Sequence, residues 1–315
     1  AESVTQFQAQ SYKELFPAGG PVKTQIMGMT NPQVEAQSKR VKEFMNYQLT
    51  HIMEEYEPEL DQMLFHLPLS GSAFRKIYFD DKLGRPVSKF VSSEDLVVPY
   101  DSTDLITCMR ITHVIKMPAN DVRKYQASGF YTDIELGEAY DQENSEVQDR
   151  IDELDGAKRV YTKDNIHTIL EMHVDLDLPG YEDANEAGES SGISLPYIVS
   201  IDENSSKILS IRRNYAEQDA LKIKKQYFVH YKFLPGLGFY GFGLIHMLGG
   251  LSKSATSILR QLIDAGTLAN LPSGFKARGL RIRDDDQPLV PGEFRDVDAP
   301  AGEISSSLVP LPYKE

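Results

Sequence analysis

The stretch that decides the fold runs from Phe228 to Gly279 and reads FVHYKFLPGLGFYGFGLIHMLGGLSKSATSILRQLIDAGTLANLPSGFKARG. Its first residues are typical of a β-strand, and a glycine-rich bend separates them from a helical pattern over Leu244–Asn270 that Pro272 and Gly274 end. The apolar positions of that pattern are Leu244, Met247, Leu248, Leu251, Ile258, Leu259, Leu262 and Ile263. The predicted hinge between strand and helix consists of Gly236, Gly238, Gly241 and Gly243, which we expect to permit unusual backbone dihedrals.

The chain before this stretch mixes helical and strand patterns. After a polar lead-in, Asn31-Pro32 opens a helical pattern that we extend over residues 31–57. Short apolar runs with Gly and Pro punctuation predict antiparallel strands from Leu64 to Val98, with DDKLGRP as a hairpin turn. Arg110–Met117 predicts another strand, and a short helix follows it.

Two further segments complete the prediction. Residues 133–155 are strongly acidic and almost free of large apolar side chains, which indicates a solvated excursion and an internal boundary. Residues 165–234 return to strand patterns separated by polar turns, which predicts a β-meander. The fold class expected from the whole sequence is therefore α+β.

Composition narrows the function classes. The 315 residues carry a formal net charge of −14, which argues against a protein that coats nucleic acid but is compatible with a channel that DNA slides through. With one cysteine, Cys108, the chain can form no internal disulfide, which suits a reducing compartment. It contains no apolar run of bilayer-spanning length and no signal-peptide pattern at its first residues, so we expect neither export nor membrane insertion.

The sharpest enzymatic pattern is Gly236-x-Gly238-x-x-Gly241, which follows a strand and precedes a helix as a dinucleotide-binding turn does. No second parallel strand is predicted after the helix, and aromatic residues crowd the turn, so a structural bend is the preferred interpretation. A nucleotide-binding oxidoreductase of the NAD type remains the alternative. Common nucleophile, zinc-protease and phosphate-loop motifs are also missing from the sequence, which argues against ATPase activity of the P-loop kind. We expect no enzymatic activity and no cofactor.

One strand and the loop after it carry possible metal ligands. Alternation in HTILEMHVDLD places His167, Glu171, His173, Asp175 and Asp177 on one face, and we expect that face to be solvated and not to bind metal. Asp175, Asp177, Gly180, Asp183 and Glu186 match several positions of a calcium loop. Pro179 stands where a ligand is expected, however, and strands flank the segment, so we expect no ion there either.

The helix from Leu244 carries two further sets of residues. Gly250, Ser254, Ser257 and Ala265 are small and permit close packing between neighbouring helices. Lys253 and Arg260 are seven residues apart and therefore share one face. An ion pair between Arg260 and Asp264, one turn on, is the alternative to a role for this face in a channel.

The stretch from Phe228 to Gly279 resembles the part of short-tailed and related bacteriophage portal proteins where wing β-structure passes into a stem helix. The resemblance extends to PYIVSID, KILSIRRNY, PLVPGEFRDVD, LVPLPYKE, LPLSGSAFRKIYFD and SSEDLVVPYDSTDL, and together these segments are spread over residues 60–315. It implies a wing at 1–238, a stem helix at 239–270 and the start of a clip at 271–315. Since no second stem helix follows, the chain resembles a truncated portal subunit.

Proteins of that family form rings, usually of twelve subunits, at one vertex of the capsid. The resemblance implies a homo-oligomer in the virion, assembled in the bacterial cytoplasm, through which double-stranded DNA passes without sequence specificity. It also implies three protein partners, namely terminase, the major capsid protein and a tail adaptor. The candidate DNA-channel residues are Lys253, Arg260, Lys276 and Arg278.

Overall fold

The computed structural model describes residues 2–137, 166–183 and 191–270, together with four short strands beyond them. The acidic stretch 133–155 lies almost wholly outside the described residues. The chain divides into two compact units, Ala1–Met247 and Leu248–Glu315, so the division falls within helix α6, Leu244–Asn270. The short strands belong to the second unit and pair antiparallel as β9 with β12 and β10 with β11. Their bounds are Gly274–Lys276 for β9, Arg281–Ile282 for β10, Val297–Asp298 for β11 and Leu308–Pro310 for β12.

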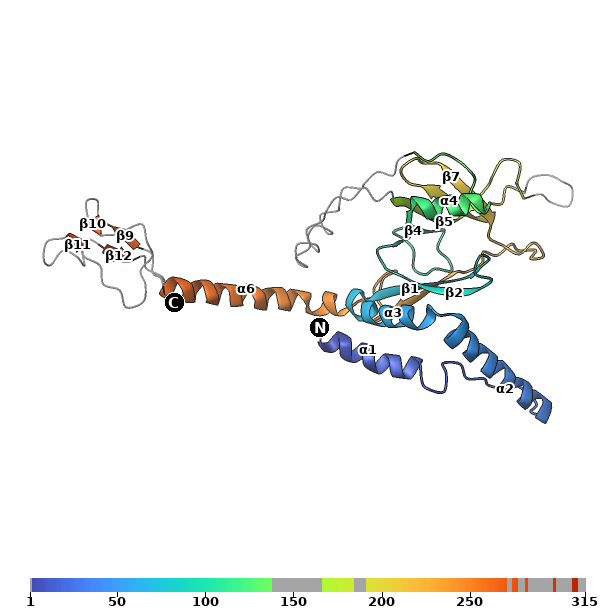
Figure 1. Cartoon of the computed structure of the whole chain (residues 1–315), viewed down its shortest axis with the longest axis horizontal. Helices are drawn as coiled ribbons and strands as arrows, with labels where there is room; N and C mark the ends of the chain where they lie inside the picture. Colours follow the sequence, from blue (N-terminus) through green and yellow to red (C-terminus); the bar gives the residue numbers. More distant parts are fainter. Residues whose placement is uncertain are drawn as a thin grey trace. The chain divides into compact units, whose positions relative to one another are not determined.

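The first unit is built from two antiparallel sheets, which makes the fold α+β as expected (Figure 1). The smaller sheet has the strand order β2-β1-β8, with bounds Arg85–Val91, Ser72–Asp80 and Phe228–Lys232. The larger sheet has the order β3-β4-β5-β6-β7, with bounds Leu96–Val97, Arg110–Pro118, Ile166–Leu176, Leu195–Asp202 and Ile208–Arg213. The predicted hairpin is confirmed, because β1 pairs with β2 from Phe74 opposite Val91 to Asp80 opposite Arg85.

The predicted β-meander over 165–234 is only partly correct. Strands β5, β6 and β7 follow one another in the larger sheet, as a meander requires. Strand β8 instead pairs with β1, with Phe74 opposite His230. Sequence reasoning could not separate β8 from the meander, because strand periodicity does not specify the partner strand.

The N-terminal helices correct the sequence prediction in three places. The segment 31–57 is not one helix: α2, Pro32–Tyr47, passes into the π-helical turn η1, Gln48–Ile52, and a separate helix α3 spans Tyr56–Ser70. Leu64, where strands were expected to begin, is a buried residue of α3. The polar lead-in is itself a helix, α1, Glu2–Leu15. The start of α2 is as predicted, since Val34 N donates a hydrogen bond to the Asn31 side chain at 2.8 Å.

Helices α1 and α3 cover one face of the smaller sheet (Figure 1). Leu60, Met63 and Leu64 of α3 are buried in one cluster with Ala73 of β1. Phe7 of α1 packs edge-on against Phe233, with 5.2 Å between ring centroids. These aromatic contacts explain how a segment with few aliphatic residues is held as a helix.

The larger sheet has its own helix and core. Helix α4, Ala119–Ala127, begins directly after β4 and packs through Val122 on Ile169 and Leu209 of the sheet. Phe74 of β1, Phe228 of β8 and Ile111 of β4 belong to another buried cluster, which joins the two sheets. The two-sheet unit therefore has a core of its own.

Candidate functional site

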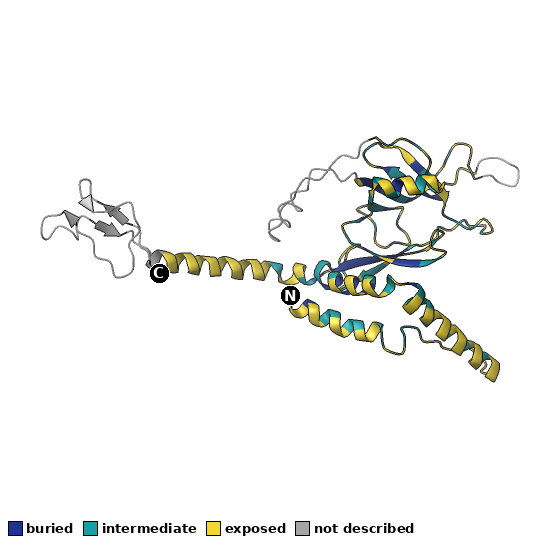
Figure 2. Ribbon diagram, in the orientation of Figure 1, coloured by how far each residue is buried: buried dark blue, intermediate teal, exposed yellow. Residues whose placement is uncertain are grey.

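Helix α6 is the most exposed regular element of the chain. Every residue from Gly250 to Thr267 is exposed, and Figure 2 shows the helix coloured as exposed along nearly its whole described length. Its large apolar residues share that exposure, with Leu251 at 71% and Leu262 at 64%. Soluble monomers rarely present contiguous apolar surface of this kind unless it binds something.

The helical period places these apolar residues along one stripe. Leu248, Leu251, Leu259 and Leu262 follow one another at spacings of three, eight and three residues, so they recur on the same side of the helix. Ile258 and Ile263 flank that line. This set, Leu248, Leu251, Ile258, Leu259, Leu262 and Ile263, is called the apolar stripe of α6 below.

The small and basic residues predicted for this helix lie elsewhere on it. Gly250, Ser254 and Ser257 share the side opposite the apolar stripe, and Ala265 lies at its border. Lys253 and Arg260 lie beside the small residues, both exposed. In the described part of the chain, neither cation forms an ion pair, so the alternative pairing of Arg260 with Asp264 is not formed.

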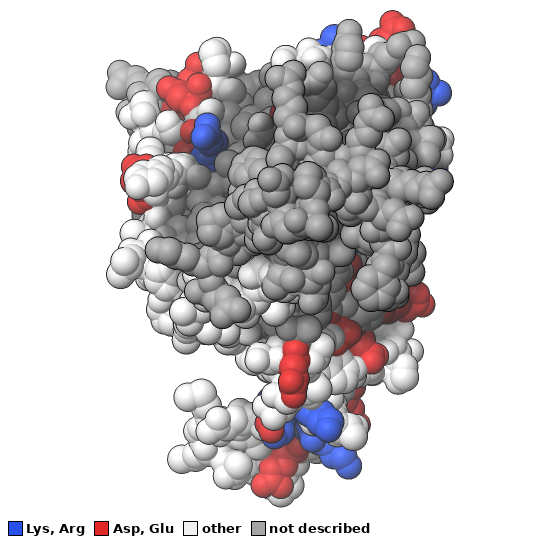
Figure 3. Space-filling model, turned by 90° about the vertical axis from the view of Figure 1, so that its left-hand side faces the viewer, with Lys and Arg blue, Asp and Glu red and all other residues white. Residues whose placement is uncertain are grey.

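The structure describes less of Lys276 and Arg278, the other two predicted channel residues. The backbone of Lys276 belongs to β9, while Arg278 lies outside the described residues. On the face that Figure 3 shows, the described Lys and Arg residues are interspersed with Asp and Glu and form no continuous basic patch.

The glycine bend before α6 is required for close packing, not for unusual dihedrals. None of the four hinge glycines has a positive φ, which corrects the prediction. A Cβ on Gly236 would lie 2.0 Å from Tyr240 O, and one on Gly243 would lie 2.2 Å from Leu69 O. A Cβ on Gly241 would lie 2.4 Å from Gly71 O, whereas Gly238 has open space around it. Three of the four glycines therefore let two backbone segments approach.

A serine and a histidine that sequence reasoning missed fasten this bend to β1. Ser72 Oγ accepts a hydrogen bond from Gly241 N at 2.8 Å and lies 3.1 Å from His230 Nε2. The His230 ring stacks on Phe74 and on Phe239, at centroid distances of 4.4 and 4.7 Å, and those two rings lie 5.9 Å from each other. Burial, together with the Lys232 charge, lowers the pKa of His230 to about 4, so the ring is neutral at pH 7. No linear motif could reveal this contact, because Ser72 and Gly241 are 169 residues apart.

The bend does not form a dinucleotide-binding unit. Strand β8 before it pairs antiparallel with β1, and in the part of the chain that the structure describes no parallel strand follows α6. A dinucleotide fingerprint needs a parallel strand–helix–strand unit, so the geometry behind the oxidoreductase alternative is missing there.

The face predicted to be solvated is buried at His167, Glu171 and His173 of β5, against the prediction, whereas Asp175 and Asp177 at its end are exposed as predicted. His167, Glu171 and His173 are 4%, 9% and 6% exposed, while Leu170 and Met172 on the opposite face are half-buried. The prediction failed because it assumed that the apolar face of the strand must point inward. The smaller sheet covers the polar face and supplies a partner for its charge.

That partner is Lys76 of β1. Its Nζ lies 2.7 Å from Glu171 Oε1, and His173 Nε2 donates to the same oxygen at 2.9 Å. Burial alone would raise the pKa of Glu171, but the hydrogen bond from His173 and the Lys76 charge outweigh it and hold that pKa below its ordinary value. The carboxylate therefore stays ionised inside the protein, as a buried charge does when it is paired and hydrogen-bonded.

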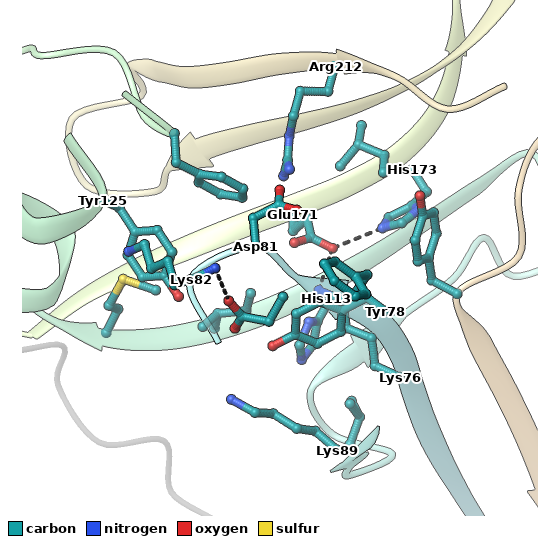
Figure 4. Close-up of a pocket in the computed structure, with 18 of the residues that line it drawn as sticks. Lys76, Tyr78, Asp81, Lys82, Lys89, His113, Tyr125, Glu171, His173 and Arg212 are labelled. Carbon is teal, nitrogen blue, oxygen red and sulfur yellow. Dashed lines mark hydrogen bonds and ion pairs between the residues drawn. The ribbon is translucent and has the colours of Figure 1, made fainter. Parts of the chain in front are cut away.

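This network lines a cavity of about 590 Å³ between the two sheets, drawn in Figure 4. Lys76, Glu171, His173 and His113 approach from β1, β5 and β4. Burial, with a further contribution from the Lys76 charge, lowers the pKa of His113 to about 4. No described protein group forms a hydrogen bond with the buried His113 Nδ1. The cavity thus combines a neutral histidine with an ionised carboxylate that pairs with Lys76.

The sequence predicted that neither strand β5 nor the calcium-like loop after it binds a metal ion. Among the described residues, no group of three His, Cys, Asp or Glu side chains is arranged to hold an ion. Asp183 of the calcium-like loop instead pairs with Lys222 and accepts a hydrogen bond from Ser191. Glu186 lies outside the described residues. His167 contacts Asp202 at 3.1 Å, which gives that ring a protein partner.

No protein-family model matches this sequence, and no curated protein matches it with significance. Within the described part of the chain, no helix combines the length and apolar character that crossing a bilayer requires.

Proposed function

We propose that this chain is a non-catalytic structural subunit of a ring that forms the DNA entry and exit channel at one capsid vertex, as in the phage portal proteins it resembles. The observation that carries the proposal is the exposed apolar stripe of α6. A helix that one chain leaves exposed gains burial when identical copies pack side by side. A head-to-tail contact of this kind, where two different helix faces meet, closes into a ring when the rotation allows it.

The faces of α6 suit such an assembly. In a head-to-tail contact, the apolar stripe of one copy packs against another face of the next, and the small side chains of Gly250, Ser254 and Ser257 permit a close approach. Lys253 and Arg260 are separate from the stripe and have no described acidic partner, so both charges are available to phosphates in a channel. In this proposal the ring has twelve copies, and its partners are terminase, the major capsid protein and a tail adaptor. It is located in the virion after assembly in the bacterial cytoplasm.

Negative-stain imaging with light scattering tests the proposal directly. We expect closed rings with a central hole and a mass several times that of one chain. Equilibrium dialysis with NAD belongs in the same experiment. A monomer under all conditions that retains NAD would reject the ring and favour the oxidoreductase alternative.

A further inference from the structure

The inter-sheet cavity carries positive charge that the chain itself does not neutralise. Lys82, Lys89 and Arg212 all line it, and none of them forms an ion pair in the described part of the chain. In a protein with a net charge of −14, three unpaired cations around one cavity are not expected from composition. The arrangement favours a negatively charged occupant.

The acidic residues around the cavity cancel this charge only in part. Glu171 is already shared by Lys76 and His173. Asp80 closes its own hairpin turn, where its Oδ1 accepts a hydrogen bond from Lys82 N at 2.9 Å. Asp81 is exposed and is the remaining carboxylate of the lining. The lining has four cations, Lys76, Lys82, Lys89 and Arg212, against these three carboxylates, so its net charge is 4 − 3 = +1.

Aromatic rings form one wall of the cavity and hold two of the cations in place. Tyr125, Phe130 and Tyr131 pack together, each pair with 5.2 Å between ring centroids. Arg212 Cζ lies 4.0 Å from the Phe130 centroid, and Lys82 Nζ lies 3.2 Å from the Tyr125 centroid. A guanidinium held over a ring keeps its N–H donors available for a bidentate anion such as phosphate.

We propose that this cavity binds a phosphorylated aromatic molecule of the size of a nucleoside monophosphate, with its phosphate on Arg212 and its planar ring against the wall of Tyr125, Phe130 and Tyr131. The volume of about 590 Å³ is within the range of small-molecule sites, roughly 300–1,000 Å³. Lys82 and Lys89 add to the positive field at the cavity. This proposal does not depend on ring formation.

Calorimetric titration of the intact chain with AMP tests the proposal, with adenosine and inorganic phosphate as partial probes. We expect AMP to bind and to raise the melting temperature, and each partial probe to bind at least tenfold more weakly. Arg212→Ala is expected to weaken AMP binding at least tenfold. Arg213→Ala is the matched control, because Arg213 is the next residue, pairs with exposed Glu217 and does not line the cavity.

Three results would overturn the proposal. The first is the absence of AMP binding at millimolar concentration, and the second is binding that Arg212→Ala leaves unchanged. The third is tighter binding of a single-stranded oligonucleotide than of AMP, which would assign the surface to nucleic acid. Because Arg212 is exposed, its variant should remain folded, and Lys89→Gln provides a second variant if it does not.

Discussion

The two-sheet unit and helix α6 differ in how far their apolar side chains are buried. In the two-sheet unit, Phe74, Ile169 and Leu209 are completely buried, and even the charged groups Lys76 and Glu171 lie inside as a pair. In α6, by contrast, leucines and isoleucines are exposed from one turn to the next. The first region therefore obtains its burial within one chain, and in the proposed ring the second obtains it from neighbouring copies.

The largest effect is expected when the apolar stripe is made acidic. Leu251→Asp combined with Leu262→Asp should abolish assembly, because each copy would bring two unpaired charges into a helix–helix contact. Light scattering measures the mass, and circular dichroism should show the two-sheet unit unchanged. Thr256→Asp, on the face of α6 that carries Lys253 and Arg260, is the control and should assemble. A double variant that assembles like the wild type would show that the stripe is not the interface.

The second effect concerns a charge inside the two-sheet unit. Glu171→Ala should destabilise it by about 3–5 kcal/mol, since Lys76 would be left buried and unpaired. Urea denaturation measures the loss, and Lys76→Met with Glu171→Met should recover most of it. The matched control is Glu43→Ala, which removes an exposed pair with Lys39 on α2 and should cost less than about 1 kcal/mol. Equal losses of unfolding free energy for Glu171→Ala and Glu43→Ala would show that burial does not make the Lys76–Glu171 pair more important than an exposed one.

The third effect is a dependence on pH. His113 has an ordinary pKa of 6.5 when unfolded and about 4 in the fold, so the unfolded state binds more protons between these values. Stability should therefore fall as the pH drops from about 7 toward 4, by ~3 kcal/mol over the whole window for this residue. Lys76, Lys89, Glu171 and His173 all act on this ring.

Denaturation at several pH values checks that prediction. His113→Leu should flatten the decline between pH 7 and pH 5. Replacing exposed His51 by Leu is the control and should leave the slope unchanged. His230 also has a lowered pKa and should supply part of the slope that remains. A His113 variant with the full wild-type slope would count against the burial argument.

The fourth effect concerns the close packing of the glycine bend that connects β8 to α6. Gly243→Ala should destabilise the bend by about 1–3 kcal/mol, because its Cβ would lie 2.2 Å from Leu69 O. Gly238→Ala is the matched control and should be nearly neutral, since nothing lies within 4 Å of the added atom. Thermal denaturation of both variants measures the difference. Similar losses would mean that close approach is not why these glycines are present.

The smallest expected effect is that of calcium, which we predict to be zero. A site occupied only in the fold would add ~2.7 kcal/mol at a hundred times its dissociation constant. Asp183 already has Lys222 as a partner, so melting temperatures in millimolar calcium and in chelator should agree. Asp175→Asn with Asp177→Asn should assemble normally. A calcium-dependent rise that this double variant removes would make the loop an ion site.

Local patterns predicted the elements whose signals are contained in a few neighbouring residues. The Asn31 cap, the hairpin between β1 and β2 and the period of α6 were all predicted correctly. Predictions that needed a partner from elsewhere in the chain failed or were missing. The break after Tyr47, the pairing of β8 with β1 and the Ser72 contact with Gly241 belong to this group.

The sequence by itself determined the α+β class, the long amphipathic helix and the glycine-rich bend, because periodicity and turn chemistry act over a few residues. Only the tertiary structure decided that Glu171 and His173 face inward, since Lys76, 95 residues from Glu171, makes their burial tolerable. It also decided that the glycines serve close approach and that a cationic, aromatic cavity lies between the sheets. These features depend on which distant surfaces meet, and the spacing of residues along one strand or helix does not encode that.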